Sequence, residues 1–163
     1  MATPLQASVR YYRRAITKVL WVPTIANKNA PTRAELDAGT ELSVEVGAMA
    51  GWQTTSETVP TPALGSRFTP VVGGAITAAD SSLTFWASKD GDDIRQVLVR
   101  EATGFVVWMD EGDVPAQTMD VFPVTVTSQA KVRELDAAAQ IMIQVAITSE
   151  PAENVVIPAA ATP

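Results

Sequence analysis

Apolar and polar positions along this chain group into segments of strand length, and the pattern predicts a mainly β protein. Residues 42–46 alternate strictly between apolar and polar side chains, which predicts a half-buried strand. Residues 105–109 are apolar at every position, as in a central strand covered on both faces. The other predicted strands span residues 16–22, 81–87, 119–128 and 139–148.

Two short helices are predicted between these strands. Thr32 precedes Glu35 by three residues, which is the capping-box spacing, and Gly39 supplies a C-terminal stop. Asp90 and Asp93 open a second helix. Its apolar stripe, at positions 94, 97 and 98, has the spacing that packs on a sheet. Together the elements predict a mostly antiparallel β domain with a short helix packed on it.

The stretch from residue 51 to residue 60 is polar on both faces but favourable for strand formation, and Pro62 and Gly65 follow it. A strand without an apolar face cannot be held by its own core. We therefore expect residues 50–75 to protrude as a loop or hairpin that pairs with something else. A disordered surface loop is the alternative.

The sequence predicts one domain with two terminal extensions. The β domain spans 16–150, and the extensions are an N-terminal basic arm at 1–15 and an Ala- and Pro-rich tail at 151–163. Six cations and no acid precede Glu35, whereas the remainder holds six cations and eighteen acids. The basic segment either docks on the acidic body of a neighbouring copy or is simply solvated, and both readings stay open.

The composition removes most catalytic chemistry. The chain has no His and no Cys, so it lacks the commonest general base, the commonest metal ligand and all thiol chemistry. The glycines do not form a phosphate-binding loop. Two acidic clusters, 90–93 and 110–113, are explained by helix capping and turns and do not match a calcium loop. No catalytic, metal or cofactor-binding residue is therefore assigned.

Aromatic residues are expected to contact protein rather than ligand. Tyr11 and Tyr12 precede Arg13 and Arg14, a mixture found in single-strand nucleic-acid binders. An acidic body repels phosphate, so packing on protein is the favoured reading. The tryptophans are interpreted as core or interface anchors. Those at positions 52 and 108 lie in unlike sequence contexts and are not expected to form a patch.

Seven short stretches, in order from about residue 10 to residue 157, resemble the major tail tube proteins of siphophages, especially those infecting actinobacteria. They are 17–20 (TKVL), 30–36 (APTRAEL), 65–68 (GSRF), 80–85 (DSSLTF), 112–114 (GDV), 119–124 (MDVFPV) and 147–152 (ITSEPA). No single stretch is diagnostic, but the set covers nearly the whole chain.

The resemblance implies a β-sandwich or half-barrel with a flanking α-helix, a long protruding loop and no enzymatic activity. In the family, six subunits form a ring, rings stack into a hollow tube, and inner strands close a barrel around the channel. Double-stranded DNA passes through without specific binding. The implied location is the virion tail, after synthesis in the host cytoplasm, with no membrane insertion and no cofactor. Tail-tip, tape-measure and tail-terminator proteins are the implied further partners.

Two sets of residues are candidates for these roles. The face that points inward stays open, because a one-residue slip reverses it. Candidate interface residues are Arg10, Tyr11, Arg13, Arg14, Trp52, Gln53, Thr55, Glu57, Arg67 and Phe68. Candidate lumen-facing residues are Ser43, Glu45, Ser82, Thr84, Thr125, Thr127, Gln140 and Gln144.

Two alternatives belong to other functional classes. A phage decoration protein or a carbohydrate-binding β-sandwich would need a concave patch of exposed aromatic side chains beside amides. A hydrolase would need two carboxylates facing each other across a cleft, and nothing in the sequence singles out such a pair.

Overall fold

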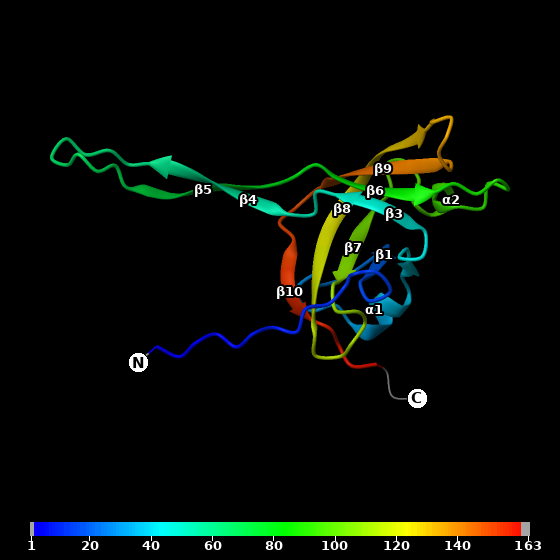
Figure 1. The fold of residues 1–163 in the computed structure, drawn as a ribbon, viewed down its shortest axis with the longest axis horizontal. Coiled ribbons are helices and arrows are strands. Elements are labelled where there is room, and N and C mark those ends of the chain that lie inside the picture. The colour runs from blue at the N-terminus through cyan, green and yellow to red at the C-terminus, as the bar shows by residue number, and fades with distance from the viewer. Residues whose placement is uncertain (1, 161–163) are drawn as a thin grey trace.

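The computed structural model describes residues 2–160 and shows one curved antiparallel sheet from which a hairpin and the N-terminal segment project (Figure 1). The first residue of the predicted arm and residues 161–163 of the predicted tail lie outside the described part. The main sheet has the strand order β2-β1-β7-β8-β9-β6-β3, and β10 pairs with β8. The predicted mainly antiparallel β fold is confirmed.

Five of the six strands predicted for the sheet lie close to their predicted positions, and the one predicted at residues 42–46 does not. The strands of the main sheet are β1 (Lys18–Val22), β2 (Thr40–Glu41), β3 (Val46–Ala50), β6 (Ser81–Trp86), β7 (Thr103–Met109), β8 (Thr118–Val132), β9 (Gln140–Ile147) and β10 (Ala152–Val156). Strand β8 is the longest, because its first half pairs with β7 and β10 and its second half with β9. A register shift between Val126 and Ser128 is a bulge of the kind that bends a strand, and the sheet curls there.

Strand β7 is covered on both faces, as predicted. Val106 and Trp108 point into the larger core cluster, which fills the inside of the curled sheet. Val107 and Met109 point into a second cluster on the opposite face. That second cluster is closed by Leu36 of α1 (Arg33–Asp37) and by buried side chains of β10. The period-two alternation of a strand is what divides these four residues between two cores.

Both predicted helices form. In α1 the capping box is complete: Thr32 caps the backbone N–H of Glu35, and the Glu35 carboxylate accepts from the Thr32 backbone N–H at 2.7 Å. In α2 (Ile94–Val97), Asp93 is the N-cap and accepts from the Arg95 N–H at 3.1 Å. Asp90 lies in the preceding turn. These caps satisfy donors that each helix start leaves open.

The strand predicted for residues 42–46 is wrong. Leu42 is buried and donates its N–H to the Val19 carbonyl at 2.8 Å, and residues 43–45 form a turn. The Ser43 hydroxyl accepts from the Val19 N–H at 2.9 Å. Strand β3 begins only at Val46, where pairing with β6 becomes available. Alternation over five residues shows that a segment is able to form a strand, but not which other strand would form backbone hydrogen bonds with it.

Residues 152–156 form β10 where the sequence suggested the start of a tail. Ala152, Val155 and Ile157 are buried against the face of the sheet that carries Val107 and Met109. Their burial holds the C-terminal segment beside β8. The Ala- and Pro-rich composition obscured the spacing of the apolar residues in this segment. That spacing contributes to stability only when the residues pack on the surface of the sheet.

Candidate assembly surfaces

Strands β4 (Thr54–Pro60) and β5 (Val71–Ala78) form a separate two-stranded sheet that projects far from the body (Figure 1). They pair only with each other. Most of the hairpin is exposed, including Val59 opposite Val72 and Phe68 in the connecting tip, residues 61–70. An isolated hairpin is at best marginally stable in water. The predicted protrusion is confirmed, and it ends three residues later than expected.

The root of the hairpin is fixed by two residues with left-handed backbone conformation. Gly51 has φ 81° and Trp52 has φ 63°. A Cβ at Gly51 would lie 2.3 Å from the Asp80 carbonyl oxygen, so only glycine fits. Trp52 donates its backbone N–H to Ser81 Oγ at 3.0 Å and its indole N–H to the Ser82 carbonyl at 3.1 Å. These contacts hold the chain as it leaves the sheet.

Trp52 also joins an aromatic cluster. Its ring centroid lies 5.4 Å from that of Trp108, with planes inclined at 57°, and 5.4 Å from that of Phe122 in an edge-on contact. The two tryptophans, which nothing in the sequence places together, are in contact because the curled sheet brings β7 under the hairpin root. Trp108 is only 6% exposed, and its Nε1 has no hydrogen-bond partner among the described residues.

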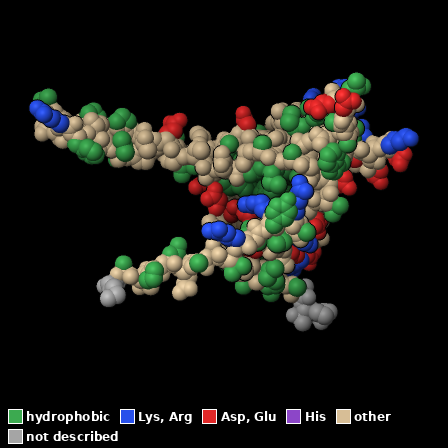
Figure 2. Space-filling model, in the orientation of Figure 1, with side chains coloured by type: hydrophobic (Ala, Val, Ile, Leu, Met, Phe, Trp, Pro, Cys, Tyr) green, Lys and Arg blue, Asp and Glu red, His purple; other side chains and the backbone are tan. Residues whose placement is uncertain are grey.

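A groove of about 560 Å³ runs between the β3 edge and the segment that leads into β1. A smaller hollow of about 190 Å³ adjoins it and shares Arg13, Met49 and Trp108 with it. We call the two together the Trp108 groove. Figure 2 shows apolar surface beside cationic and anionic side chains in the hollow between the hairpin and the N-terminal segment.

One end of the Trp108 groove is acidic. Asp110, which forms an ion pair with Arg13, and Asp120 both line it. Burial raises the pKa of Asp120, the Asn154 N–H lowers it, and the carboxylates of Glu153, Asp110 and Glu111 raise it further. Partial burial and then the Glu111 and Asp110 carboxylates raise the pKa of the Tyr11 phenol. Four carboxylates therefore gather around this end of the groove with the ion-paired Arg13, whereas Arg14 and Lys18 line the larger hollow.

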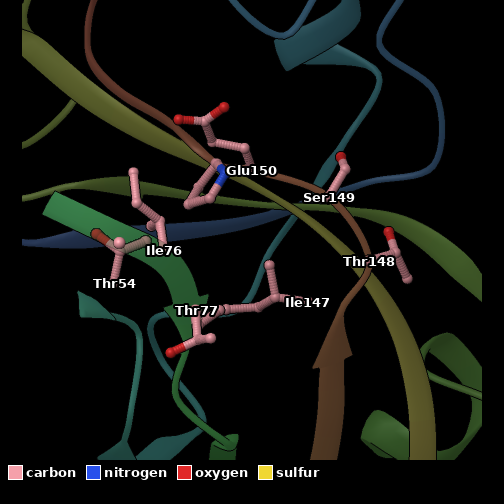
Figure 3. A pocket seen from close by; sticks show the side chains of 10 residues that line it. Thr54, Ile76, Thr77, Ile147, Thr148, Ser149 and Glu150 are labelled. Carbon is pink, nitrogen blue, oxygen red and sulfur yellow. The ribbon is translucent and has the colours of Figure 1, made fainter. Parts of the chain in front are cut away.

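A second hollow, of about 480 Å³, lies where the hairpin meets the chain between β9 and β10. Figure 3 shows that Thr54, Ile76 and Thr77 come from the hairpin, and that the labelled residues from Ile147 to Glu150 come from the other side. Thr54 Oγ1 donates to Glu153 at 2.9 Å. This hydrogen bond ties the start of β4 to β10.

The N-terminal segment up to residue 12 is exposed and forms no strand. Leu5 is 99% exposed and Val9 is 94% exposed. Four of the six cations that precede Glu35 have partners within the chain. Arg13 pairs with Asp110, Lys18 with Glu41 at 3.2 Å, Lys28 with the Glu150 carbonyl, and Arg33 with Asp113 through bonds of 2.7 and 2.6 Å. Arg10 and Arg14 make no ion pair within the described residues.

Five candidate lumen residues share one face of the sheet. Ser82 lies opposite Gln144, and the register places Thr84, Thr125 and Gln140 on the same side. On β3, β6, β9 and β8 from Thr125 onward, the residues that the register assigns to this face include no Asp, Glu, Lys or Arg, and we call this part the uncharged face. It consists of Ala48, Ala50, Ser82, Thr84, Trp86, Thr125, Ser128, Ala130, Val132, Gln140, Met142, Gln144 and Ala146.

The other lumen candidates lie elsewhere. Thr127 lies at the β8 bulge and donates to the Gln144 carbonyl at 3.0 Å. Ser43 and Glu45 are in the turn before β3, and the Ser43 hydroxyl is engaged with Val19.

The candidate interface residues divide between the two projections and the hairpin root. Gln53, Thr55 and Glu57 lie along the first hairpin strand or just before it, and Arg67 and Phe68 lie in the tip. The sequence did not single out Asp120 or Glu153. No local signal marks them, because the pairing of β8 with β7 and β10 assembles the acidic end of the groove.

The described residues hold no group of three or more side chains arranged to bind a metal ion. None of the helices in the described part of the chain combines the length and apolar character needed to cross a bilayer.

A sequence model for the family described as "Phage tail tube protein" matches residues 5–160. No curated protein matches the sequence significantly. The fold is similar to a chain of the "anti-feeding prophage (AFP) baseplate, 6-fold symmetrised", with a TM-score of 0.54 and 14% identity over 91% of this chain and 95% of that one. It is equally similar to a chain of the "Tail of empty GTA particle computed with helical refinement, C6 symmetry", at 0.54 and 14% over 89% and 98%. At such identity the likeness shows the fold alone.

Proposed function

The chain belongs to the phage tail tube protein family, and from this premise we propose that it builds a hollow tube of stacked rings through which DNA leaves the particle. It is a structural component of the tail and not an enzyme. A ring of six copies is supported by the sixfold symmetry of both similar assemblies. The hairpin carries the proposal, because β4 and β5 pair only with each other.

The hairpin and the N-terminal segment act as the contacts between copies. Both expose apolar side chains: among the described residues Val9 is 94% exposed and Val72 is 52% exposed. Burying such surface against a second copy is favourable at about 25 cal/mol per Å². A head-to-tail contact of this kind closes into rings or extends as a filament. The Trp52 anchor at the hairpin root fixes the direction in which the arm reaches its neighbour.

The uncharged face lines the channel. A duplex carries one negative charge per about 1.7 Å of its axis, and cations on the wall would hold it by counterion release. The hydroxyl and amide side chains of Ser82, Thr84 and Gln144 offer water-compatible surface without such charge. The free edge of β3 is covered when sheets of neighbouring copies join around the channel.

Finer assignments are part of the same proposal. The particle is a long-tailed phage, as supported by the seven stretches that resemble siphophage tail tube proteins. The tube contacts tail-tip, tape-measure and tail-terminator proteins at its ends and along its channel. Its subunit is made in the cytoplasm of the host before it enters the virion tail.

The test is negative-stain electron microscopy of the purified protein over a range of concentrations and salt, with and without a tail-tip complex from the same particle. Hollow tubes of uniform diameter are the expected result. A species that stays monomeric under every condition, including added tail-tip complex, would contradict the proposal.

A further inference from the structure

The receiving site for the hairpin can be located, and this inference rests on the proposed stacking. We propose that the tip of one copy, residues 61–70, seats in the Trp108 groove of a second copy. In that arrangement Arg67 faces the acidic end of the groove, and an acceptor on the tip takes the hydrogen bond that the Trp108 indole offers.

The tip cannot reach the groove of its own chain. The seven residues of β4 span about 20 Å at the rise of an extended strand, and the tip lies beyond them. Figure 1 shows the hairpin pointing straight away from the body. Backbone pairing from Thr54 with Ala78 to Pro60 with Val71 keeps it from folding back. A hairpin tip that occupies the groove must therefore come from another copy.

The floor of the groove holds a donor without an acceptor. Trp108 is more than nine-tenths buried, and its Nε1 is unpartnered among the described residues. Leaving such a group unbonded costs about 1–3 kcal/mol, so buried donors are nearly always paired. The neighbouring Trp52 has its acceptor in Ser82. The Nε1 atom is closed to solvent in the single copy, so an acceptor on a seated tip, such as a main-chain carbonyl or the Ser66 hydroxyl, reaches it when the indole turns toward the groove.

Charge supports the same occupant. Asp110 and Asp120 line the smaller hollow with Arg13, and Glu111 and Glu153 act on Asp120 from nearby, whereas Arg14 and Lys18 line only the larger hollow. Arg67 is the lone cation between Arg33 and Lys89 in the sequence, and it stands in the hairpin tip. A guanidinium suits paired carboxylates because its planar fork donates to two oxygens.

Apolar surface is matched as well. The tip exposes Leu64 fully and Phe68 at 76%. The groove exposes Val44 at 83% and Met49 at 50%. Aromatic and Met side chains beside an Arg are the composition in which binding energy concentrates at interfaces. Neither set has cover within the chain.

Disulfide trapping tests the inference, because the chain has no cysteine of its own. Ser66→Cys and Met49→Cys are made as separate variants, mixed, assembled with excess wild-type protein and oxidised gently. A linked dimer that appears only in assembled tubes is the expected result. Ser66→Cys mixed with Thr127→Cys, which lies at the β8 bulge, is the matched control and should stay unlinked.

Two outcomes overturn the inference. Tubes that form normally without the 66–49 link show that the tip seats elsewhere, while leaving the proposed tube intact. A link between Met49→Cys and Val9→Cys in place of the expected one would assign the groove to the N-terminal segment. If wild-type protein forms no tubes even with a tail-tip complex, the proposed function fails first, and the inference fails with it.

A second variant, Trp108→Phe, keeps a ring in the groove but removes the donor. The smaller ring loses packing against Trp52 in the core cluster, so the Tm of the monomer should fall modestly. Tube elongation should slow by roughly fivefold, the effect of one lost hydrogen bond. Normal elongation by this folded variant would overturn the role of the indole. A purely structural role would lower Tm but leave the elongation rate of the folded variant unchanged.

Discussion

Trp52 and Trp108 lie with their ring centroids 5.4 Å apart, yet only Trp52 has an acceptor for its indole N–H. The two tryptophans have different roles at the same place in the fold. Trp52 anchors the hairpin to the body through the Ser82 carbonyl, and Trp108 forms the floor of the adjoining groove. The projecting hairpin and the Trp108 groove therefore lie next to each other at the hairpin root.

Replacing residues 55–77 by a short Gly–Ser turn should leave a folded monomer that cannot stack. Thr54 and Ala78 lie opposite each other, so a turn can join them, and Trp52 remains in place. Circular dichroism and Tm should match the wild type, because the removed strands pair only with each other. Microscopy should show no tubes. A large loss of Tm would show that the hairpin supports the core.

Trp52→Ala should destabilise the monomer by about 2–4 kcal/mol. The change removes the contacts with Trp108 and Phe122 and leaves the Ser82 carbonyl without its partner. Denaturant unfolding measures the loss. Gln53→Ala, at the next and more exposed position, is the control and should stay within about 0.5 kcal/mol of wild type. An equally small effect of Trp52→Ala would contradict its anchoring role.

Arg10→Glu combined with Arg14→Glu should slow tube formation without changing Tm. Within residues 2–160 neither side chain makes an ion pair, whereas Arg13 pairs with Asp110, so the double variant avoids breaking a contact seen there. Like charges would then face the acidic body of the neighbour. Light scattering at low and high salt measures the effect, and salt should diminish it. Unchanged kinetics at low salt would mean that these cations are only solvated.

Gln144→Lys should permit tube assembly but impair DNA delivery. The residue lies on the uncharged face opposite Ser82, and six lysines per ring would attract phosphate along the channel. Infectivity of phage carrying the variant should fall more than tail yield by microscopy. Gln144→Glu is the control that adds a charge of the opposite sign. Equal infectivity of both variants and wild type would argue against this face as the channel lining.

Lowering the pH should remove a contribution of Asp93 to stability. Its hydrogen bonds with the Arg95 side chain, and then with the Arg95 and Ser88 backbone N–H groups, lower its pKa from 3.8 to about 2. A carboxyl with a depressed folded pKa stabilises the fold above its ordinary pKa and loses that contribution as pH falls through the folded value. Wild-type stability should therefore drop between about pH 4 and pH 2.

Denaturant midpoints of wild type and Asp93→Asn across that range measure the effect, because the amide cannot titrate. The difference between the two proteins should shrink as the pH falls. Asp90→Asn, in the turn before the helix, is the matched control and should track the wild type. A constant difference between Asp93→Asn and wild type would contradict the assignment.

Features that depend on residues close together in the chain were predictable from the sequence. The capping box of Thr32 and Glu35, the turn at Gly112, the apolar run of β7 and the missing apolar face of β4 all depend on residues within one segment. The absence of His and Cys likewise follows from composition alone. These features establish the strand-rich fold and the hairpin that lacks a core.

Only the tertiary structure decided which segments meet. It turned residues 43–45 away from a strand, made β10 from a presumed tail, and placed Trp52 against Trp108, 56 positions apart in the sequence. It also gathered the carboxylates of Asp110, Asp120 and Glu153 from three strands or their ends. Strand pairing and the bend of β8 determine which residues become neighbours. Contacts between residues so far apart in the chain produce no periodic pattern in the sequence, so they could not be predicted from it.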